Sequence, residues 1–243
     1  MLLSSYGRVA SEYYDSRRHP TCANFRQASR LLLELLVPKT LAARSCEVGA
    51  GRSLLAELLW RRHGSLDGLL ITDAQPEMLE HSSCWERCGA RLAIAAADSI
   101  PVPSRSLDLV VASLADPYDD DSFWEEVFRV LTPRGNCVIT VPSATWAHRF
   151  RTDESPDNAA EFELADRSKV YVPSLVRSRE EERVLIENQG LHVIREVSAP
   201  LKALEEPISR KLHVLDPDDA VVCGVVASRF SEAERRPSRS LNA

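Results

Sequence analysis

Residues 45–59 read Ser-Cys-Glu-Val-Gly-Ala-Gly-Arg-Ser-Leu-Leu-Ala-Glu-Leu-Leu, and this stretch decides the fold of the chain. It begins as a short apolar strand, turns at two glycines and continues as an amphipathic helix. Gly49 and Gly51 permit a sharp turn and let a ligand approach the backbone where a Cβ atom would block it. The following helix directs its free N–H groups and the positive end of its dipole toward that ligand. The stretch therefore predicts a strand–turn–helix unit with a binding site at the turn.

An acidic residue, Asp73, directly follows the next apolar strand pattern, residues 68–72. Nucleoside-binding α/β folds place a carboxylate that binds ribose hydroxyls at this point, about 20 residues after the glycine turn. The dinucleotide fingerprint G-x-G-x-x-G would need a third glycine at position 54, where this chain has Leu54. The spacing therefore predicts a site for a nucleoside that carries no pyrophosphate.

Strand and helix patterns alternate along the rest of the chain. Strands are expected at 44–48, 68–72, 91–95, 107–113, 136–142, 191–198 and 219–228, and helices at 22–36, 52–62, 75–82, 120–131 and 178–189. Thr21 is expected to cap the first helix. Such alternation is typical of a mostly parallel sheet that helices cover on both faces, which is a doubly wound α/β fold.

The segment 144–177 interrupts this alternation. Apolar and polar residues alternate over 161–164 and 170–172, on either side of Asp166-Arg167-Ser168, and this pattern predicts a β-hairpin. Residues 1–20 have no apolar periodicity of their own, so we expect little core to hold them in the free protein and expect ligand contacts to order them. The polar segment 231–243 is expected to be disordered.

Composition restricts the function classes. The chain of 243 residues is long enough for one domain, and its 44% hydrophobic content is ample for a core. A formal net charge of −6 argues against tight nonspecific binding to nucleic acid. The six cysteines are scattered, and no second ligand pair accompanies Cys84 and Cys88, so no metal site is expected. Neither a signal peptide nor an apolar run of membrane-spanning length is evident, and we expect a cytoplasmic protein with no membrane partner.

Four further motifs fall in register with the glycine turn. The first is Asp73-Ala74-Gln75-Pro76-Glu77-Met78-Leu79 after the second strand, and the next is Ala97-Asp98-Ser99 after the third strand. The other two are the fourth strand, which ends at Ser113-Leu114, and a helix that ends in Thr132-Pro133-Arg134-Gly135 before the fifth strand. Together the five motifs closely resemble the class I S-adenosylmethionine-dependent methyltransferases. The nearest branch is the one of ubiquinone-biosynthesis-type and many small-molecule enzymes. The resemblance covers about residues 40–142.

This resemblance implies S-adenosylmethionine as the cofactor and assigns residues to its parts. It assigns Glu47, Gly49 and Gly51 to the methionine part of the cofactor and Asp73 to the ribose. The adenine is assigned Ala74, Met78, Asp98 and Ser99, and the sulfonium and the acceptor are assigned Ser113 and Leu114. Tyr14 lies in the N-terminal segment that closes over the site. Carboxylates suit a ribose diol and an exocyclic amine because they accept hydrogen bonds from both.

The resemblance also implies an architecture. We expect one methyltransferase domain over 1–230 with a seven-stranded sheet whose last strand is antiparallel. Residues 1–38 would form an N-terminal helical lid and the helix after it. The segment 144–177, after the fifth strand, would supply a hairpin that covers the substrate.

Three side chains are candidates for catalysis: His19, His148 and Asp116. Imidazole titrates near neutral pH and can take a proton from a nucleophile, although either histidine could equally lie on the surface. Asp116 belongs to Ala115-Asp116-Pro117-Tyr118, which is similar to the Asp-Pro-Pro-Tyr box of amino-group methylases but lacks one proline and begins too late after the strand. An ordinary substrate-side loop is the alternative, and many methyl transfers need only alignment of the reactants.

The sequence thus predicts methyl transfer from S-adenosylmethionine to an acceptor, with a small metabolite favoured over RNA or protein. One alternative is a catalytically silent S-adenosylmethionine-binding regulatory protein. Another is a nicotinamide-dependent oxidoreductase, which Leu54 disfavours. The sequence does not identify the acceptor, the methylated atom or the oligomeric state.

Overall fold

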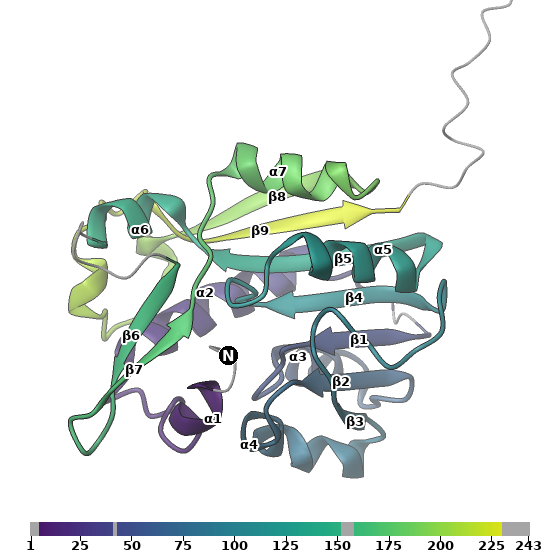
Figure 1. The fold of residues 1–243 in the computed structure, drawn as a ribbon, viewed down its shortest axis with the longest axis horizontal. Helices are drawn as coiled ribbons and strands as arrows, with labels where there is room; N and C mark the ends of the chain where they lie inside the picture. Colours follow the sequence, from purple (N-terminus) through teal and green to yellow (C-terminus); the bar gives the residue numbers. More distant parts are fainter. Residues whose placement is uncertain (1–4, 41–42, 152–157, 230–243) are drawn as a thin grey trace, which may run out of the picture.

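The computed structural model describes residues 5–40, 43–151 and 158–229, which fold around a seven-stranded sheet of order β3-β2-β1-β4-β5-β9-β8 (Figure 1). The strands are β1 (Ser45–Val48), β2 (Leu69–Asp73), β3 (Arg91–Ile94), β4 (Leu107–Ser113), β5 (Leu131–Pro142), β8 (His192–Pro200) and β9 (Ala220–Ser228). Strands β1 to β5 are parallel, whereas β9 runs antiparallel to both β5 and β8. The expected seven strands and the antiparallel last strand are therefore confirmed.

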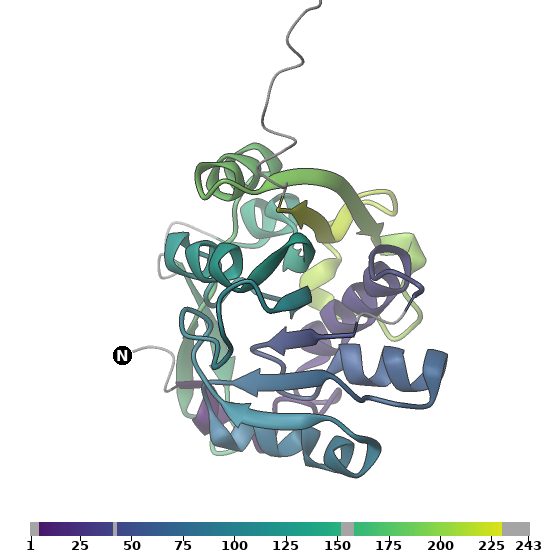
Figure 2. The ribbon, with the colours of Figure 1, turned by 90° about the vertical axis from the view of Figure 1, so that its right-hand side faces the viewer.

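Helices cover both faces of this sheet. They are α2 (Pro20–Leu36), α3 (Leu54–His63), α4 (Pro76–Leu79) with the 3₁₀ helix η1 (Glu80–Cys88), α5 (Asp121–Val130) and α7 (Arg179–Asn188). One apolar core lies between the sheet and α2 and α3, and the second lies between the sheet and α5 and α7. Figure 2 shows the purple and blue helices α2 and α3 on one side of the strands and the teal α5 on the other. The doubly wound arrangement predicted from the alternating pattern is confirmed.

Local details differ from the expected pattern in three places. Helix α2 begins at Pro20, whose fixed φ suits the first helical position. Thr21 therefore does not cap the helix, and its hydroxyl lies 2.6 Å from that of Ser209. Strand β5 starts at Leu131 instead of 136, because Leu131 pairs with Leu107 before the register shifts. The helix expected over 75–82 divides into the single turn of α4 and the longer η1.

The lid and the inserted hairpin form one unit. Strands β6 (Ala159–Glu163) and β7 (Lys169–Pro173) confirm the predicted hairpin, and α1 (Ser5–Val9) packs against β7. Val9 is fully buried in a small cluster with Phe162, Val170 and Val172. The expectation of little core was wrong for the described residues 5–20, because they share a core with the hairpin. Between β5 and the hairpin lies α6 (Ala144–Phe150), which the sequence pattern did not predict.

Two expectations concern the ends of the chain and membranes. The segment 231–243 lies outside the described residues. Within residues 5–40, 43–151 and 158–229, no helix combines the length and the apolar character needed to cross a bilayer.

Candidate functional site

The glycine turn lies where β1 leads into α3, at the carboxyl ends of the parallel strands. Gly49 and Gly51 have φ values of 58° and 46°, a left-handed conformation that favours glycine. Two tyrosine side chains stand over them. A Cβ at position 49 would collide with the ring of Tyr118, and one at position 51 would collide with the hydroxyl of Tyr14. The turn is therefore shaped so that side chains of other segments reach its backbone.

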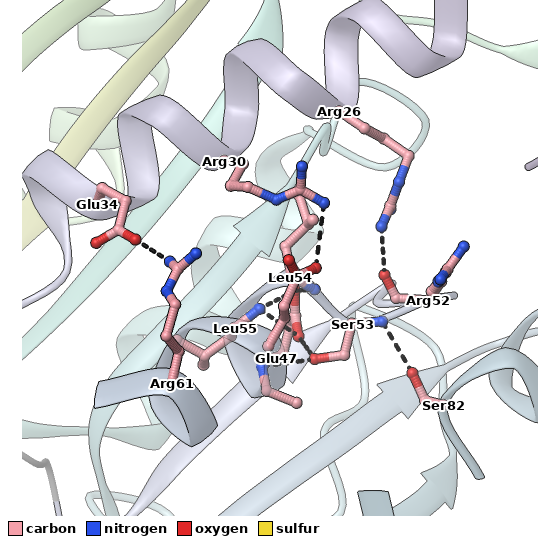
Figure 3. Close-up of polar contacts among 12 residues, drawn as sticks. Arg26, Arg30, Glu34, Glu47, Arg52, Ser53, Leu54, Leu55, Arg61 and Ser82 are labelled. Carbon is pink, nitrogen blue, oxygen red and sulfur yellow. Dashed lines mark hydrogen bonds and ion pairs between the residues drawn. The ribbon is translucent and has the colours of Figure 1, made fainter. Parts of the chain in front are cut away.

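Hydrogen bonds fix both tyrosines in this position. The Tyr118 hydroxyl donates to the carbonyl of Val48 at 2.8 Å, and the Arg52 amide donates to the Tyr14 hydroxyl at 2.6 Å. The Arg26 guanidinium lies 4.8 Å from the centre of the Tyr14 ring and donates to the Arg52 carbonyl at 2.8 Å (Figure 3). The second turn of α2, which carries Arg26, thus helps to hold the lid over the glycine turn.

Glu47, which the resemblance assigned to the methionine part, has its carboxylate turned toward the start of α3. It is fully buried and accepts from the Ser53 hydroxyl and from the amides of Leu54 and Leu55 at 3.2 Å (Figure 3). Burial raises the pKa of Glu47, and these donors oppose the rise by stabilising the anion. The carboxylate therefore caps the positive end of the helix dipole.

Asp73 ends β2 beside the glycine turn and is 8% exposed. Its Oδ2 accepts from the Gly51 amide at 2.8 Å, and its Oδ1 accepts from the Gln75 amide at 2.9 Å. Burial raises the pKa of Asp73, while the backbone donors act in the opposite direction. The carboxylate both fixes the turn and lines a small cavity next to it.

This small cavity, which we call the turn cavity, has a volume of about 80 Å³. The sequence-predicted residues that line it are Tyr14, Gly49, Asp73, Ala74, Met78, Ser113 and Leu114. Asp98 and Ser99 lie exposed in the loop after β3, just beyond Ala97, which does line it. The lining residues that sequence reasoning did not assign are Tyr6, Tyr13, Arg26, Ala50, Gln75, Ala95, Ala97, Pro117 and Tyr118. The pair Pro117-Tyr118 was visible as part of a motif, but nothing in the sequence showed that it folds back onto Gly49.

A second, larger cavity of about 1140 Å³ lies beside the turn cavity, and we call it the outer cavity. The lid, α6, the hairpin and the 3₁₀ helix η3 (Arg210–Leu212) contribute to its walls. Three residues, Tyr6, Tyr13 and Leu114, line both cavities.

Leu114 has a φ of 56°, which is rare for a leucine, and its amide donates to the Thr140 hydroxyl at 2.9 Å. Such backbone strain is typical of functional sites.

Asp116 and His19 lie in the outer cavity, whereas His148 is exposed on α6 and does not line it. Asp116 is 8% exposed and accepts from the Ser174 hydroxyl at 2.6 Å. Burial raises the pKa of Asp116 to about 7, although Ser174 and Arg151 favour the ionised form. A carboxyl group that titrates near neutral pH is suited to accept a proton during catalysis.

His19 is buried at the start of α2, with its ring 5.2 Å from that of Phe162. Its Nε2 lies 3.9 Å from Oε2 of Glu12, and neither atom has a hydrogen-bond partner among the described residues. Burial lowers the pKa of His19, and Glu12 opposes that effect. The His19 side chain lines the outer cavity, but its Nε2 atom is itself buried beside Glu12.

Candidate metal ligands do not gather in the part of the chain that the structure describes, where no group of three or more His, Cys, Asp or Glu side chains could hold an ion. Cys84 and Cys88 are free thiols. No metal site is therefore built from these residues.

Comparison with known proteins connects this geometry to a family. Residues 46–139, from β1 into β5, match the family model described as a methyltransferase domain. No curated protein matches the chain.

Solved structures show the same fold at low sequence identity. A chain of the complex between the Haloferax volcanii Trm112 methyltransferase activator and a methyltransferase has a TM-score of 0.67 and 16% identity, with 96% of this chain and 99% of that chain covered. A SAM-dependent methyltransferase from Thermotoga maritima has a TM-score of 0.64 and 14% identity, with 93% and 99% covered. An S-adenosylmethionine-dependent methyltransferase from Mesorhizobium loti has a TM-score of 0.61 and 15% identity, with 84% and 100% covered.

Proposed function

We propose that the chain is a class I S-adenosylmethionine-dependent methyltransferase that methylates a small-molecule acceptor held in the outer cavity. The observation that carries this proposal is the shared boundary of the two cavities at Tyr6, Tyr13 and Leu114. A ligand at the glycine turn and a ligand in the outer cavity would meet there. The boundary lies at the exit of β4, and open α/β sheets bind ligands at the carboxyl ends of their strands.

The residues around the turn cavity fit the cofactor. Gly49 and Gly51 carry no Cβ atom, the side chains of Tyr118 and Tyr14 lie over them, and the buried carboxylate of Asp73 lines the cavity beside them. We propose that Asp73 accepts from the ribose hydroxyls and that Ala74 and Met78 contact the adenine. Bound S-adenosylmethionine supplies an electrophilic methyl group on a sulfonium. The role of this part of the chain is to bind and orient that group.

Proton removal is assigned to Asp116. It lies two positions after Leu114, at the side of the outer cavity next to the shared boundary. A carboxyl group with a pKa of about 7 can accept the acceptor's proton as the nucleophile forms its bond to the methyl carbon. Tyr6, Tyr13 and residues of the hairpin contribute to the walls of the outer cavity beside Asp116. His19 is the second candidate to bind or deprotonate the acceptor.

A small molecule is proposed over RNA or protein because the lid and the hairpin contribute walls to the outer cavity. The net charge of −6 also disfavours a polyanionic acceptor such as RNA. The cavity slightly exceeds the range of about 300 to 1,000 Å³ that is usual for small-molecule sites.

Labelled methyl transfer tests the function. The purified chain is incubated with methyl-labelled S-adenosylmethionine and a fractionated cell extract, and we expect label in the small-molecule fraction. Asp116→Asn should lose most of the transfer. His148→Ala is the matched control and should retain it, because His148 lies outside both cavities. Label in RNA or protein alone, or equal activity of Asp116→Asn, would contradict the proposal.

Cofactor binding is measured separately by calorimetry. S-adenosylhomocysteine should bind in the micromolar range, about −7 to −8 kcal/mol, and NAD far more weakly. Asp73→Ala should cost about 1.5–3 kcal/mol of affinity, because charge-assisted hydrogen bonds are lost. Unchanged affinity in the folded variant would restrict Asp73 to its role in the turn.

A further inference from the structure

The outer cavity has two aromatic walls. In the first, the rings of Trp146 and Phe150 stack at 5.3 Å with an interplanar angle of 6°, and Phe25 meets Trp146 edge-on at 4.8 Å. In the second, Tyr13 of the lid stacks on Phe162 of β6 at 5.8 Å. All five rings line the cavity. Aromatic walls favour a flat, unsaturated ligand, because such a ligand offers ring faces and edges of complementary charge.

Most charges on the cavity lining already have a partner of opposite sign. The pairs are Arg18 with Glu12 at 3.6 Å, Arg167 with Glu163 at 2.8 Å and Glu161 with Lys169 at 3.0 Å. Arg151 donates to the Ser174 hydroxyl at 2.7 Å, and that hydroxyl donates to Asp116. Each carboxylate of the lining therefore already has a hydrogen-bond or ion-pair partner.

Two cations on η3 differ from the others. Arg210 and Lys211 line the cavity at its exposed rim, and neither forms an ion pair within residues 5–40, 43–151 and 158–229. The Lys211 ammonium lies 5.1 Å from the centre of the Phe150 ring, at the end of the Trp146–Phe150 stack. The cavity therefore joins an aromatic interior to a positively charged rim.

We propose that the acceptor is an aromatic acid whose ring lies between the aromatic walls and whose carboxylate binds Arg210 and Lys211. The nucleophilic group of the ring system then points toward Leu114 and Asp116. This inference rests on the proposed function, since it names the substrate class of the same site. Its physical basis is charge complementarity, because a carboxylate supplies the partner that both cations lack among the described residues.

Two probes of closely similar shape, one anionic and one neutral, test the proposal. The anionic probe is 6-hydroxy-2-naphthoate, and the neutral probe is 6-hydroxy-2-naphthamide. Binding to the full chain saturated with S-adenosylhomocysteine is followed by calorimetry, which does not depend on turnover. We expect the naphthoate to bind at least about fivefold more tightly than the naphthamide, which is the effect of partly exposed ion pairs.

Variants locate the effect on η3. The double variant Arg210→Gln with Lys211→Gln should remove the preference for the acid and leave naphthamide affinity unchanged. Lys202→Gln is the matched control, because this exposed lysine pairs with Asp218 and lies outside the cavity. It should keep the full preference.

Several results would overturn the proposal: equal or weaker binding of the naphthoate, absence of binding by both probes at millimolar concentration, or an unchanged preference in the double variant. A failure of this kind together with intact cofactor binding and methyl transfer contradicts the acceptor class alone. Absence of cofactor binding and of methyl transfer contradicts the proposed function instead.

Discussion

The hydroxyl of Tyr118 donates a hydrogen bond to the carbonyl of Val48, and this bond holds the tyrosine ring over the glycine turn. The turn cavity that remains is about 80 Å³, well below the size of about 300 Å³ at which small-molecule sites usually begin. We therefore expect the Tyr118 ring to move when a nucleoside cofactor binds at the turn. Because a ligand binds only the open fraction of the chain, the hydrogen bond lowers the apparent affinity.

Tyr118→Phe tests this closing role. The variant keeps the ring and loses a single hydrogen bond, which contributes about 1 kcal/mol. We expect the association rate of S-adenosylhomocysteine to rise about fivefold, measured by surface plasmon resonance. Tyr171→Phe is the control, because Tyr171 is an exposed hairpin residue that lies away from the turn. Slower association in Tyr118→Phe would show instead that the hydroxyl assists the cofactor directly.

Gly49→Val should abolish cofactor binding, because its side chain would take the space that the Tyr118 ring now fills and that a cofactor at the turn would need. The variant also pays left-handed backbone strain of about 1–2 kcal/mol, so a control with the same strain is needed. Gly64 has a φ of 68°, and a Cβ there would meet open space. Gly64→Val should therefore lose stability but bind S-adenosylhomocysteine normally in calorimetry. If a folded Gly49→Val chain still binds, the ligand lies elsewhere.

The fold could be predicted largely from the sequence because its signals are local. Strands such as β1 and β2 are buried along their whole length, so they appear as short apolar runs with glycine nearby. Helix α6 gave no such signal, because seven residues are too few to establish an apolar periodicity. Ser143, which caps the start of α6, was not recognised as a helix cap from the sequence either.

The site was less accessible to sequence reasoning because it depends on contacts between distant segments. Val9 and Phe162 pack together across more than half of the chain, and no local pattern records that contact. His19 and His148 are chemically identical in the sequence, yet the structure places only His19 in a cavity. The residue type gave the candidates, whereas tertiary packing selected between them.

The pH dependence of turnover should report Asp116. Since its pKa is raised to about 7, kcat/KM should rise with pH through about 7 as the carboxylate forms. Ser174→Ala removes a donor to the carboxylate and should move this midpoint upward by about one pH unit. Asp116→Asn should abolish the rise together with most of the activity. A midpoint that stays at the same pH in Ser174→Ala would assign the titration to another group.

The stability of the folded chain should fall as pH rises, whereas turnover should rise. The folded state holds the Asp116 proton more tightly than the unfolded state, whose pKa is about 3.9. The stabilisation from the protonated form is complete below that value and is lost as pH rises through about 7. Urea denaturation of the wild type and Asp116→Asn across this range measures the difference. An Asn variant that loses stability as steeply as the wild type would contradict this assignment.

The shared core of lid and hairpin makes a prediction about motion. Val9→Ala removes buried apolar volume at a cost of roughly 1–3 kcal/mol, and the loss falls on the small cluster that joins α1 to β6 and β7. Because this cluster is separate from the two cores of the sheet, amide exchange should accelerate in residues 5–20 and 158–173 together, with β1 to β5 unchanged. Val184→Ala is the control, since that side chain is 48% exposed on α7.

The same exchange experiment tests whether the lid responds to the cofactor. Tyr6, Tyr13 and Tyr14 all line the turn cavity, so a ligand there should contact the lid and order it. We expect S-adenosylhomocysteine to slow exchange in residues 5–20 of the wild type and, through the shared cluster, in the hairpin. Val9→Ala should weaken the protection of the hairpin more than that of the glycine turn, because the mutation uncouples lid from hairpin and leaves the turn intact. Identical exchange with and without ligand, or acceleration confined to the lid, would show that the two segments move independently.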